Sequence, residues 1–476
     1  MGQEIEAAHF KPEDFLLFQQ KLTQETRMLD TMLQKNAFSS QHPVAGFEIE
    51  AWIVDNIMQP APVNDQFLQS FNNPLACEEL AKFNLELNSV PQPLQGDGLR
   101  QMHKQFQQTW DQALRHASTL DKQLLMIGTL PTLQADELNL HNMSDRNRYR
   151  ALNEQILNSR GKPVHLDIIG HEHLKLDHHD VMMEAATTSF QIHIQVPAEL
   201  AHHYYNAAII ASSIMVGACA NAPFLFGHDL WSETRIPLFE QAIETGGYAG
   251  VAGGPLKRVS FGTDFAKHSI MECFSENHAH FPVLLPECKD TEIAEFAHLK
   301  LHNGTIWRWN RPLIGISDNG MPHIRIEHRT PSAGPTVIDA IANMALFYGL
   351  CKKFTDDIID NGLPIGFSQA KDNFYQAARF GLDAHIGWKN GQKHRLHWWL
   401  EHHFIDAALE GLDALHIDRK DGEDYLELIR QRVNNRQTGS QWQRKYIQKH
   451  GKHFKQMTQH YLQLQQTGLP VSEWEY

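Results

Sequence analysis

Four short stretches of this chain alternate apolar residues with residues that can bind metal ions or phosphate. They span residues 47–52, 85–88, 190–196 and 324–329. Successive side chains of a β-strand point to opposite faces, so each stretch predicts a strand with one apolar and one polar face. The polar positions are Glu48, Glu50, Glu86, Asn88, Gln191, His193, Arg325, Glu327 and Arg329. On one sheet they would combine carboxylates, an imidazole and guanidiniums.

Carboxylates gathered on one face repel one another. At a separation of about 5 Å and an effective dielectric near 20, each pair costs roughly 3 kcal/mol, so the groups must protonate or bind cations. Carboxylates with one imidazole and no thiolate favour Mg²⁺ or Mn²⁺. Mg²⁺ often takes further ligands from substrate phosphates, and Arg325 and Arg329 suit phosphate geometry. The pattern therefore predicts a divalent-cation site beside a phosphate-bearing substrate.

Each stretch also has an ordinary interpretation. A single Glu-x-Glu strand is usually the wet face of a sheet, and a lone strand histidine such as His193 is often structural. The sequence Arg325–Arg329 can be a cross-strand salt-bridge ladder. The four stretches together favour function, because their apolar neighbours are typical of central strands. A central strand carries such polar residues chiefly where its face lines a cavity.

The surrounding pattern predicts an α+β fold around a mostly antiparallel sheet. Helices are expected at 12–36, 98–120, 146–157, 198–220 and 336–360, and strands at 46–54, 82–88, 124–129, 184–196 and 322–329. After residue 360 only helices are expected. We therefore predict a catalytic domain at 1–360 and a helical C-terminal region at 361–476.

Composition narrows the function. The net charge of -14 over 476 residues argues against a nucleic-acid partner. Five scattered Cys without a C-x-x-C pair argue against a disulfide framework or a cysteine zinc site. The acidic N-terminus lacks the apolar segment of a signal peptide, and the longest apolar stretch, 207–222, is too short and too polar to span a bilayer. We expect a cytoplasmic protein with small-molecule substrates and no membrane partner; a homo-oligomer stays open.

Neither a P-loop nor a G-x-G-x-x-G turn is present, so any bound ATP must be held differently. Residues 246–254 contain five glycines and precede Lys257 and Arg258. This segment could close over an anionic ligand such as ATP, or could be a plain surface loop. The His-rich residues 171–179 are interpreted as a solvated loop. The basic stretch 430–455 is interpreted as an amphipathic helix rather than a nucleic-acid surface.

Several motifs, taken in order, resemble the glutamate–cysteine ligase family in its second, plant- and proteobacteria-type branch, which includes carboxylate–amine ligases. The motifs are Gly46–Glu50, Asn84–Asn88, Arg148–Arg150, Thr187–His193, Ala220–Phe224 and Arg325–Arg329. The resemblance runs from about residue 45 to 350. It implies a glutamine-synthetase-like fold: a curved, mainly antiparallel sheet whose concave face holds metal ions and ATP.

The resemblance also implies roles for individual residues. The implied Mg²⁺ (or Mn²⁺) ligands are Glu48, Glu50, Glu86, His193 and Glu327. The implied catalytic residues are Glu327 with Arg325 and Arg329, the two arginines facing the ATP phosphates and an acyl-phosphate intermediate. The implied substrate-binding residues are Asn88, Gln191, Arg235, Arg148 and Tyr149.

The activity that the resemblance implies is ATP-dependent ligation. An amino-acid carboxylate, expected to be that of glutamate, would be activated as an acyl phosphate and joined to an amine, expected to be cysteine or a related compound. Two rivals remain. A metal-dependent amidohydrolase could use the same Glu and His residues to activate water. A catalytically silent relative could bind nucleotide or amino acid as a sensor.

Overall fold

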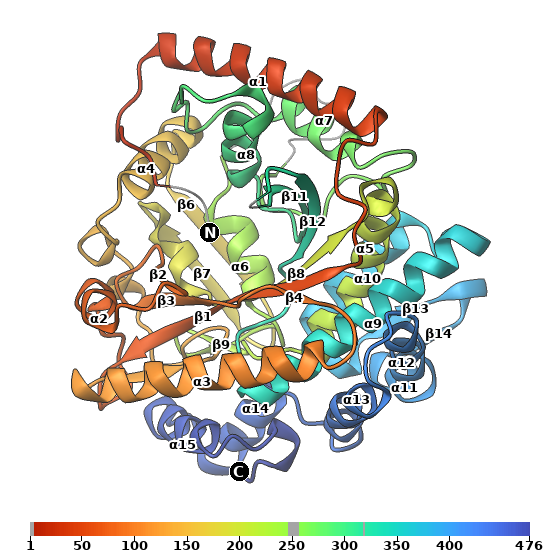
Figure 1. Cartoon of the computed structure of the whole chain (residues 1–476). Helices are drawn as coiled ribbons and strands as arrows, with labels where there is room; N and C mark the ends of the chain where they lie inside the picture. The colour runs from red at the N-terminus through yellow and green to blue at the C-terminus, as the bar shows by residue number, and fades with distance from the viewer. Residues whose placement is uncertain (1–3, 246–256, 318) are drawn as a thin grey trace.

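The computed structural model describes residues 4–245, 257–317 and 319–476. Its centre is an antiparallel sheet with the strand order β11-β12-β8-β1-β3-β2, in which β4 and β5 also pair with β1 (Figure 1). The strands are β1 Val44–Val54, β2 Ala76–Glu78, β3 Asn84–Asn88, β4 Gln92–Pro93, β5 Gln123–Leu125, β8 Phe190–Val196, β11 Asn310–Ile316 and β12 Pro322–His328. The predicted antiparallel sheet is confirmed.

The four alternating stretches are neighbours in this sheet. They form β12, β8, β1 and β3, which lie next to one another in that order. Strand β8 is shorter than predicted, because residues Val181–Ala186 form the 3-10 helix η3 instead. The side chain of Asp180 caps that helix by accepting a hydrogen bond from the backbone N–H of Met182. Strand β11, which follows the tryptophans of residues 307–309, was not predicted.

Helices cover the apolar face of the sheet. They are α3 (Gly98–Thr119), α5 (Ala201–Ala218) and α9 (Val337–Asn361), and Figure 1 shows α3 running along this side. Phe47 of β1 packs edge-to-face on Phe106 of α3, with ring centroids 5.0 Å apart. Tyr348 of α9 donates its hydroxyl to the backbone carbonyls of Gly46 and His193. These contacts hold the strands from behind and leave their polar face to the other side.

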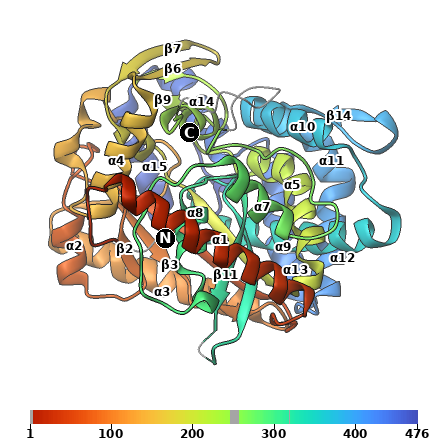
Figure 2. The same cartoon turned by 90° about the horizontal axis from the view of Figure 1, so that it is seen from above.

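Helices on the polar side stand away from the strands. They are α1 (Pro12–Gln34), α4 (Asn147–Arg160), α7 (Met271–His280) and α8 (Ala297–Gly304), which Figures 1 and 2 show on the side opposite α3. A buried Glu25 of α1 accepts from the backbone N–H of Leu299 and contacts His298, so α1 and α8 are locked together. This arrangement leaves a space over the sheet.

The C-terminal region packs mainly against α5 and α9, the helices behind the sheet. Its helices are α10 Phe367–Phe380, α11 Leu396–Trp399, η8 Leu400–Phe404, α12 Ile405–Ala414, α13 Arg419–Asn434, α14 Gly439–His450 and α15 Phe454–Gln466. Arg432 of α13 forms a buried 2.7 Å ion pair with Asp339 of α9, and Tyr461 of α15 donates to the carbonyl of Met126. The basic stretch 430–455, predicted as one amphipathic helix, is mostly helical but is divided among the end of α13, α14 and the start of α15, with Trp442 of α14 fully buried.

Two short hairpins contradict the sequence predictions. Strands β13 (His385–Gly387) and β14 (Lys393–Arg395) pair within the region predicted to contain only helices. Strands β6 (Val164–Ile169) and β7 (His173–His178) form a hairpin where a solvated loop was predicted. Strands β13 and β14 have three residues each, too few for a clear alternating pattern. In β6, by contrast, Val164, Leu166 and Ile168 alternate with polar His165 and Asp167, a signal that the sequence prediction overlooked. No helix within the described residues combines the length and apolar character needed to cross a membrane.

Candidate active site

Strand register brings the predicted polar residues together on one face. The paired positions are Glu327 with His193, Glu48 with Gln191, and Glu50 with Glu86. Because side chains at paired antiparallel positions point to the same face, the polar residues form adjacent rows. The carboxylates divide into two groups, defined by which ligand atoms approach one another.

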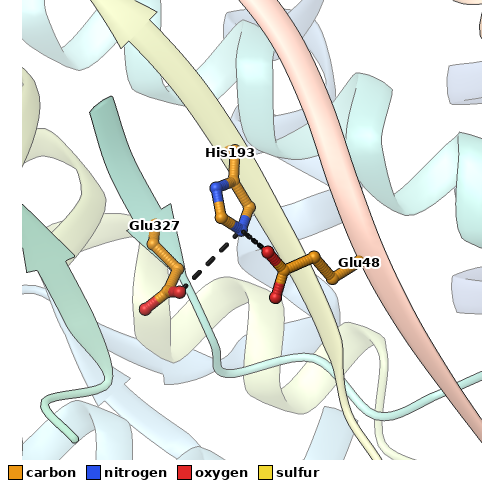
Figure 3. Close-up of side chains that lie close together, drawn as sticks. All are labelled: Glu48, His193 and Glu327. Carbon is orange, nitrogen blue, oxygen red and sulfur yellow. Dashed lines mark ion pairs between the residues drawn. The ribbon is translucent and has the colours of Figure 1, made fainter. Parts of the chain in front are cut away.

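The first group is Glu48, His193 and Glu327, whose ligand atoms all lie within 4.8 Å of one another (Figure 3). His193 Nε2 is 3.6 Å from Glu48 Oε1 and 3.8 Å from Glu327 Oε1. This nitrogen is buried and has no hydrogen-bond partner among the described residues. Burial lowers the pKa of His193 to about 4, so the ring is neutral at pH 7 and Nε2 can offer a lone pair.

Two arginines hold Glu327 in its charged form. Arg311 of β11 donates from Nε to Oε2 at 2.8 Å and from Nη2 to Oε1 at 2.9 Å, and Arg329 Nη1 lies 3.3 Å from Oε2. Burial favours the neutral acid, but the charges of Arg311 and Arg329 outweigh it and hold the pKa of Glu327 well below its ordinary value. The first group therefore stays negatively charged, and the guanidiniums of Arg311 and Arg329 compensate this charge.

The second group is Glu50, Glu79 and Glu86, with ligand atoms also within 4.8 Å of one another. Burial, followed by repulsion from neighbouring carboxylates, raises the pKa of Glu86 to about 7 and that of Glu79 well above its ordinary value. Glu50 accepts hydrogen bonds from the backbone N–H and hydroxyl of Ser189, which only partly offset the effect of burial on its pKa. This group favours either protons or a bound cation.

Both groups fit divalent cations. His193 Nε2 and Glu79 Oε1 are buried and have no hydrogen-bond partner among the described residues. This is expected of atoms that coordinate a metal ion when it is bound. The donors are carboxylate oxygens and one imidazole, the set that Mg²⁺ and Mn²⁺ accept. Glu79 was not predicted; it follows β2 in a Glu78-Glu79 pair and shows no strand alternation.

Both groups border one cavity of about 400 Å³ over the sheet. Its polar walls include Glu48, Glu50, Glu79, Glu184, Glu327, Arg148, Arg311, Arg325, Arg329, Lys289 and Lys300. Apolar walls come from α4, α7, α8 and β11, with Leu152, Phe274, Leu299, Trp307 and Leu313 among them. Such a mixture of apolar surface and convergent charged groups is typical of a small-molecule site.

Most predicted substrate and phosphate residues lie at this cavity. Arg325, Arg329, Arg148, Tyr149 and Gln191 line it. The Nε atom of Arg325 is buried without an acceptor among the described residues, so its guanidinium keeps a donor for a ligand. Gln191 accepts a hydrogen bond from Arg329 and donates to Glu50 at 3.0 Å, which links the two carboxylate groups.

Other predicted residues have structural surroundings. Arg258 is buried and donates hydrogen bonds to the carbonyl oxygens of Thr305 and Pro282. It therefore holds two backbone segments together and does not line the cavity. Lys257 is exposed. Neither side chain lines the cavity within the described residues, so the phosphate-binding role of these two residues stays a prediction without structural support. The glycine-rich segment 246–254 lies outside the described residues.

Asn88 and Arg235 stand behind the cavity. Asn88 Nδ2 donates to Glu86 Oε1 at 2.9 Å, so it positions a carboxylate of the second group. Arg235 is almost completely buried, pairs with Glu233 at 3.0 Å and donates to the carbonyls of Thr330 and Arg329. It borders a separate, smaller pocket.

Sequence reasoning missed three further residues at the site. Arg311 lies on the unpredicted strand β11, and Glu184 lies on η3, which was taken for part of a strand. Asn84 is the first residue of β3 and directly precedes the second alternating stretch, but its side chain was not singled out. The Asn310-Arg311-Pro312-Leu313-Ile314 sequence could have indicated a strand with an inward arginine.

Comparison with family models extends the resemblance. A model described as glutamate-cysteine ligase family 2 matches residues 1–463. The chain belongs to this family. The match includes most of the C-terminal helical region, so the family extends well beyond the 45–350 segment that the motifs indicated. Comparison with curated protein sequences gives no match.

Solved structures support the fold. One similar structure is a glutamate–cysteine ligase from Francisella tularensis in complex with AMP, at TM-score 0.50 and 12% identity, covering 92% of this chain and 90% of that one. Another is a bifunctional glutathione synthetase from Pasteurella multocida, at TM-score 0.50 and 11% identity, covering 93% of this chain but 54% of that one. With the topology above, they confirm the predicted α+β fold with a curved antiparallel sheet, flanking helices and a helical C-terminal region.

Proposed function

We propose that this chain is an ATP- and Mg²⁺-dependent ligase that joins an amino-acid carboxylate to an amine. The observation that carries the proposal is the juxtaposition in one cavity of two carboxylate groups and several arginines. A hydrolase needs a cation to activate water, but it gives Arg325 and Arg329 no phosphate to bind. A site for a triphosphate needs both cations and guanidiniums.

The metal ions would be held by the two carboxylate groups. The residues concerned are Glu48, His193 and Glu327 in the first group and Glu50, Glu79 and Glu86 in the second. When bound, such ions neutralise phosphate charge and polarise the phosphorus that is transferred.

The reaction itself needs little from the protein beyond position and charge. An amino-acid carboxylate attacks the γ-phosphorus of ATP, the bond to ADP breaks, and an acyl phosphate forms. The amine then attacks the acyl carbon, loses a proton and expels phosphate, leaving an amide. Arg325 and Arg329 would bind the oxygens that gain charge, while Arg311 keeps Glu327 ionised and in place.

The identity of the two joined molecules is proposed from the family. The family's name and the name of the Francisella enzyme favour glutamate as acyl donor and cysteine as amine. We propose these as the first substrates to test. The apolar cavity walls formed by Phe274 and Leu299 suit the base of a nucleotide.

Release of ADP tests the proposal. The protein is incubated with ATP, Mg²⁺ and glutamate, with and without a panel of amines that includes cysteine. Amine-dependent ADP formation is expected, and Glu48→Gln should abolish it. The matched control is Glu199→Gln, an exposed acid beyond the far end of β8. Cleavage of an amide without ATP would instead establish the hydrolase.

A further inference from the structure

A small side pocket lies beside the second carboxylate group. Its volume is about 40 Å³, and it shares Glu50, Glu79, Glu184 and Arg329 with the wall of the main cavity. This volume is several times the roughly 10–15 Å³ of cavity that one water molecule needs, so a compact group of a few heavy atoms fits. A substrate in the main cavity could extend such a group into this pocket.

Unpaired polar atoms line this pocket. Asn84 of β3 is 3% exposed, yet neither its Nδ2 nor its Oδ1 has a hydrogen-bond partner among the described residues. The Nε atom of Arg235 is likewise buried without an acceptor among them. A buried amide that stays unpaired is unfavourable, and a ligand that pairs with it removes that penalty. The pocket therefore offers donors and an acceptor at the same place.

Glu184 adds a carboxylate at the border between the pocket and the main cavity. It lies on η3 and lines both the main cavity and the small pocket. Its carboxylate makes no hydrogen bond or ion pair with any residue that the structure describes, unlike Glu50, which Ser189 and Gln191 contact. Glu184 is also outside the two groups whose atoms could share an ion. Burial raises the pKa of Glu184 to about 7, and the charges of Arg329 and Arg148 only partly offset this effect. Its oxygens are open to hydrogen bonds from a cationic part of a substrate, and such a group would favour the ionised form.

We infer that this pocket binds the head group of an α-amino acid, with Glu184 as the counter-ion of its ammonium group. An ammonium group has three N–H donors, and the Glu184 carboxylate and Asn84 Oδ1 can accept hydrogen bonds from them. The adjoining carboxylate can accept from Asn84 Nδ2 and Arg235 Nε. The inference rests on the proposed function only in placing the rest of the amino acid in the main cavity. The head group could belong to the acyl donor or to the amine that it joins.

Titration calorimetry with Mg²⁺ and ADP present tests the inference on the full chain. The probes are two pairs that differ only by the ammonium group: L-glutamate with glutarate, and L-cysteine with 3-mercaptopropionate. In the unmodified protein, one amino acid should bind at least about tenfold more tightly than its des-amino analogue. The pair that shows this preference identifies which substrate occupies the pocket.

Substitution of Glu184 assigns the preference to this residue. Glu184→Gln should reduce it about tenfold or more and leave the Kd of the des-amino analogue within about twofold. Glu184→Asp should retain part of it, and the exposed control Glu199→Gln should retain all of it. An unchanged thermal shift with Mg²⁺ and ADP shows that each variant is folded.

Two outcomes overturn the inference. One is the absence of a preference in both pairs with the unmodified protein. The other is a preference that survives Glu184→Gln. Neither depends on turnover, so a protein that never forms ADP but keeps a Glu184-dependent preference would refute the ligase proposal and leave this inference standing.

Discussion

The two carboxylate groups of the cavity share one sheet face but differ in how their charge is managed. Glu327 in the first group receives two hydrogen bonds from Arg311 and lies 3.3 Å from Arg329, and its pKa is lowered. Glu86 and Glu79 in the second group accept hydrogen bonds from neutral donors and repel each other. Burial and repulsion between neighbouring carboxylates raise their pKa values.

This difference shows that residue type alone does not set the state of a buried acid. Both groups consist mainly of glutamates on adjacent strands, and burial favours the neutral form in each. In the first group a fixed guanidinium reverses that preference; in the second it is reinforced by repulsion. We therefore expect the first group to need its arginines for stability and the second to need a cation.

The largest contrast is expected from Glu327→Gln. The substitution leaves Arg311 buried without its carboxylate, so the free energy of unfolding should fall by about 3–5 kcal/mol. Amine-dependent ADP formation should fall about 10³-fold or more, because a cation ligand is lost as well. Urea unfolding and the ADP assay measure the two effects. A Glu327→Gln variant as stable as the unmodified protein would show that the buried Arg311 does not need the Glu327 carboxylate as its partner.

The pH dependence of the metal-free protein should report the second group. The pKa of Glu86 is raised to about 7 in the folded state from an unfolded value near 4.5. The folded state then binds more protons than the unfolded state between these values, so this contribution to stability is full below pH 4.5 and disappears as pH rises through 7. It amounts to about 3 kcal/mol.

The measurement is urea unfolding in chelator between pH 5 and 8, with and without Glu86→Gln. The variant should show a shallower fall in stability with pH than the unmodified chain. Equal slopes for the two proteins would contradict the assigned pKa.

Glu79→Gln should raise the stability of the metal-free protein, whereas Glu327→Gln should lower stability. Removing one of three mutually repelling carboxylates should stabilise the metal-free protein by about 1–3 kcal/mol at pH 8. The same variant should lose most of the rise in melting temperature that Mg²⁺ produces. Differential scanning fluorimetry with and without Mg²⁺ checks both effects, and a lower melting temperature without metal would count against the proposed repulsion.

The smallest effect is expected from Arg311→Lys. Lysine keeps the charge but cannot make both hydrogen bonds to Glu327, so the free energy of unfolding should fall by only about 1–2 kcal/mol. Arg311→Met should approach the loss seen with Glu327→Gln. Equal losses for the lysine and methionine variants would show that the paired hydrogen bonds, rather than the charge, stabilise the first group.

The sequence predicted the alternating strands and the gathering of their polar residues because alternation is a local property. Glu48, Glu50, Glu86, His193 and Glu327 lie on the face where the period of two places them. The sequence analysis missed Glu79, which lies outside a regular strand and so has no local period. Arg258, predicted from its place after the glycine-rich segment, donates to backbone carbonyls and does not line the cavity.

The sequence by itself therefore determined the chemical inventory of this protein: strands with one apolar and one acidic face, and arginines suited to phosphate. Only the tertiary structure decided how those acids are divided. The pairing of β11 with β12 brings Arg311 to Glu327, and the packing of residues 79 and 184 over the sheet completes the second group and the small pocket. Such contacts join segments far apart in the chain, and the pKa of a buried acid depends on those neighbours rather than on its position in sequence.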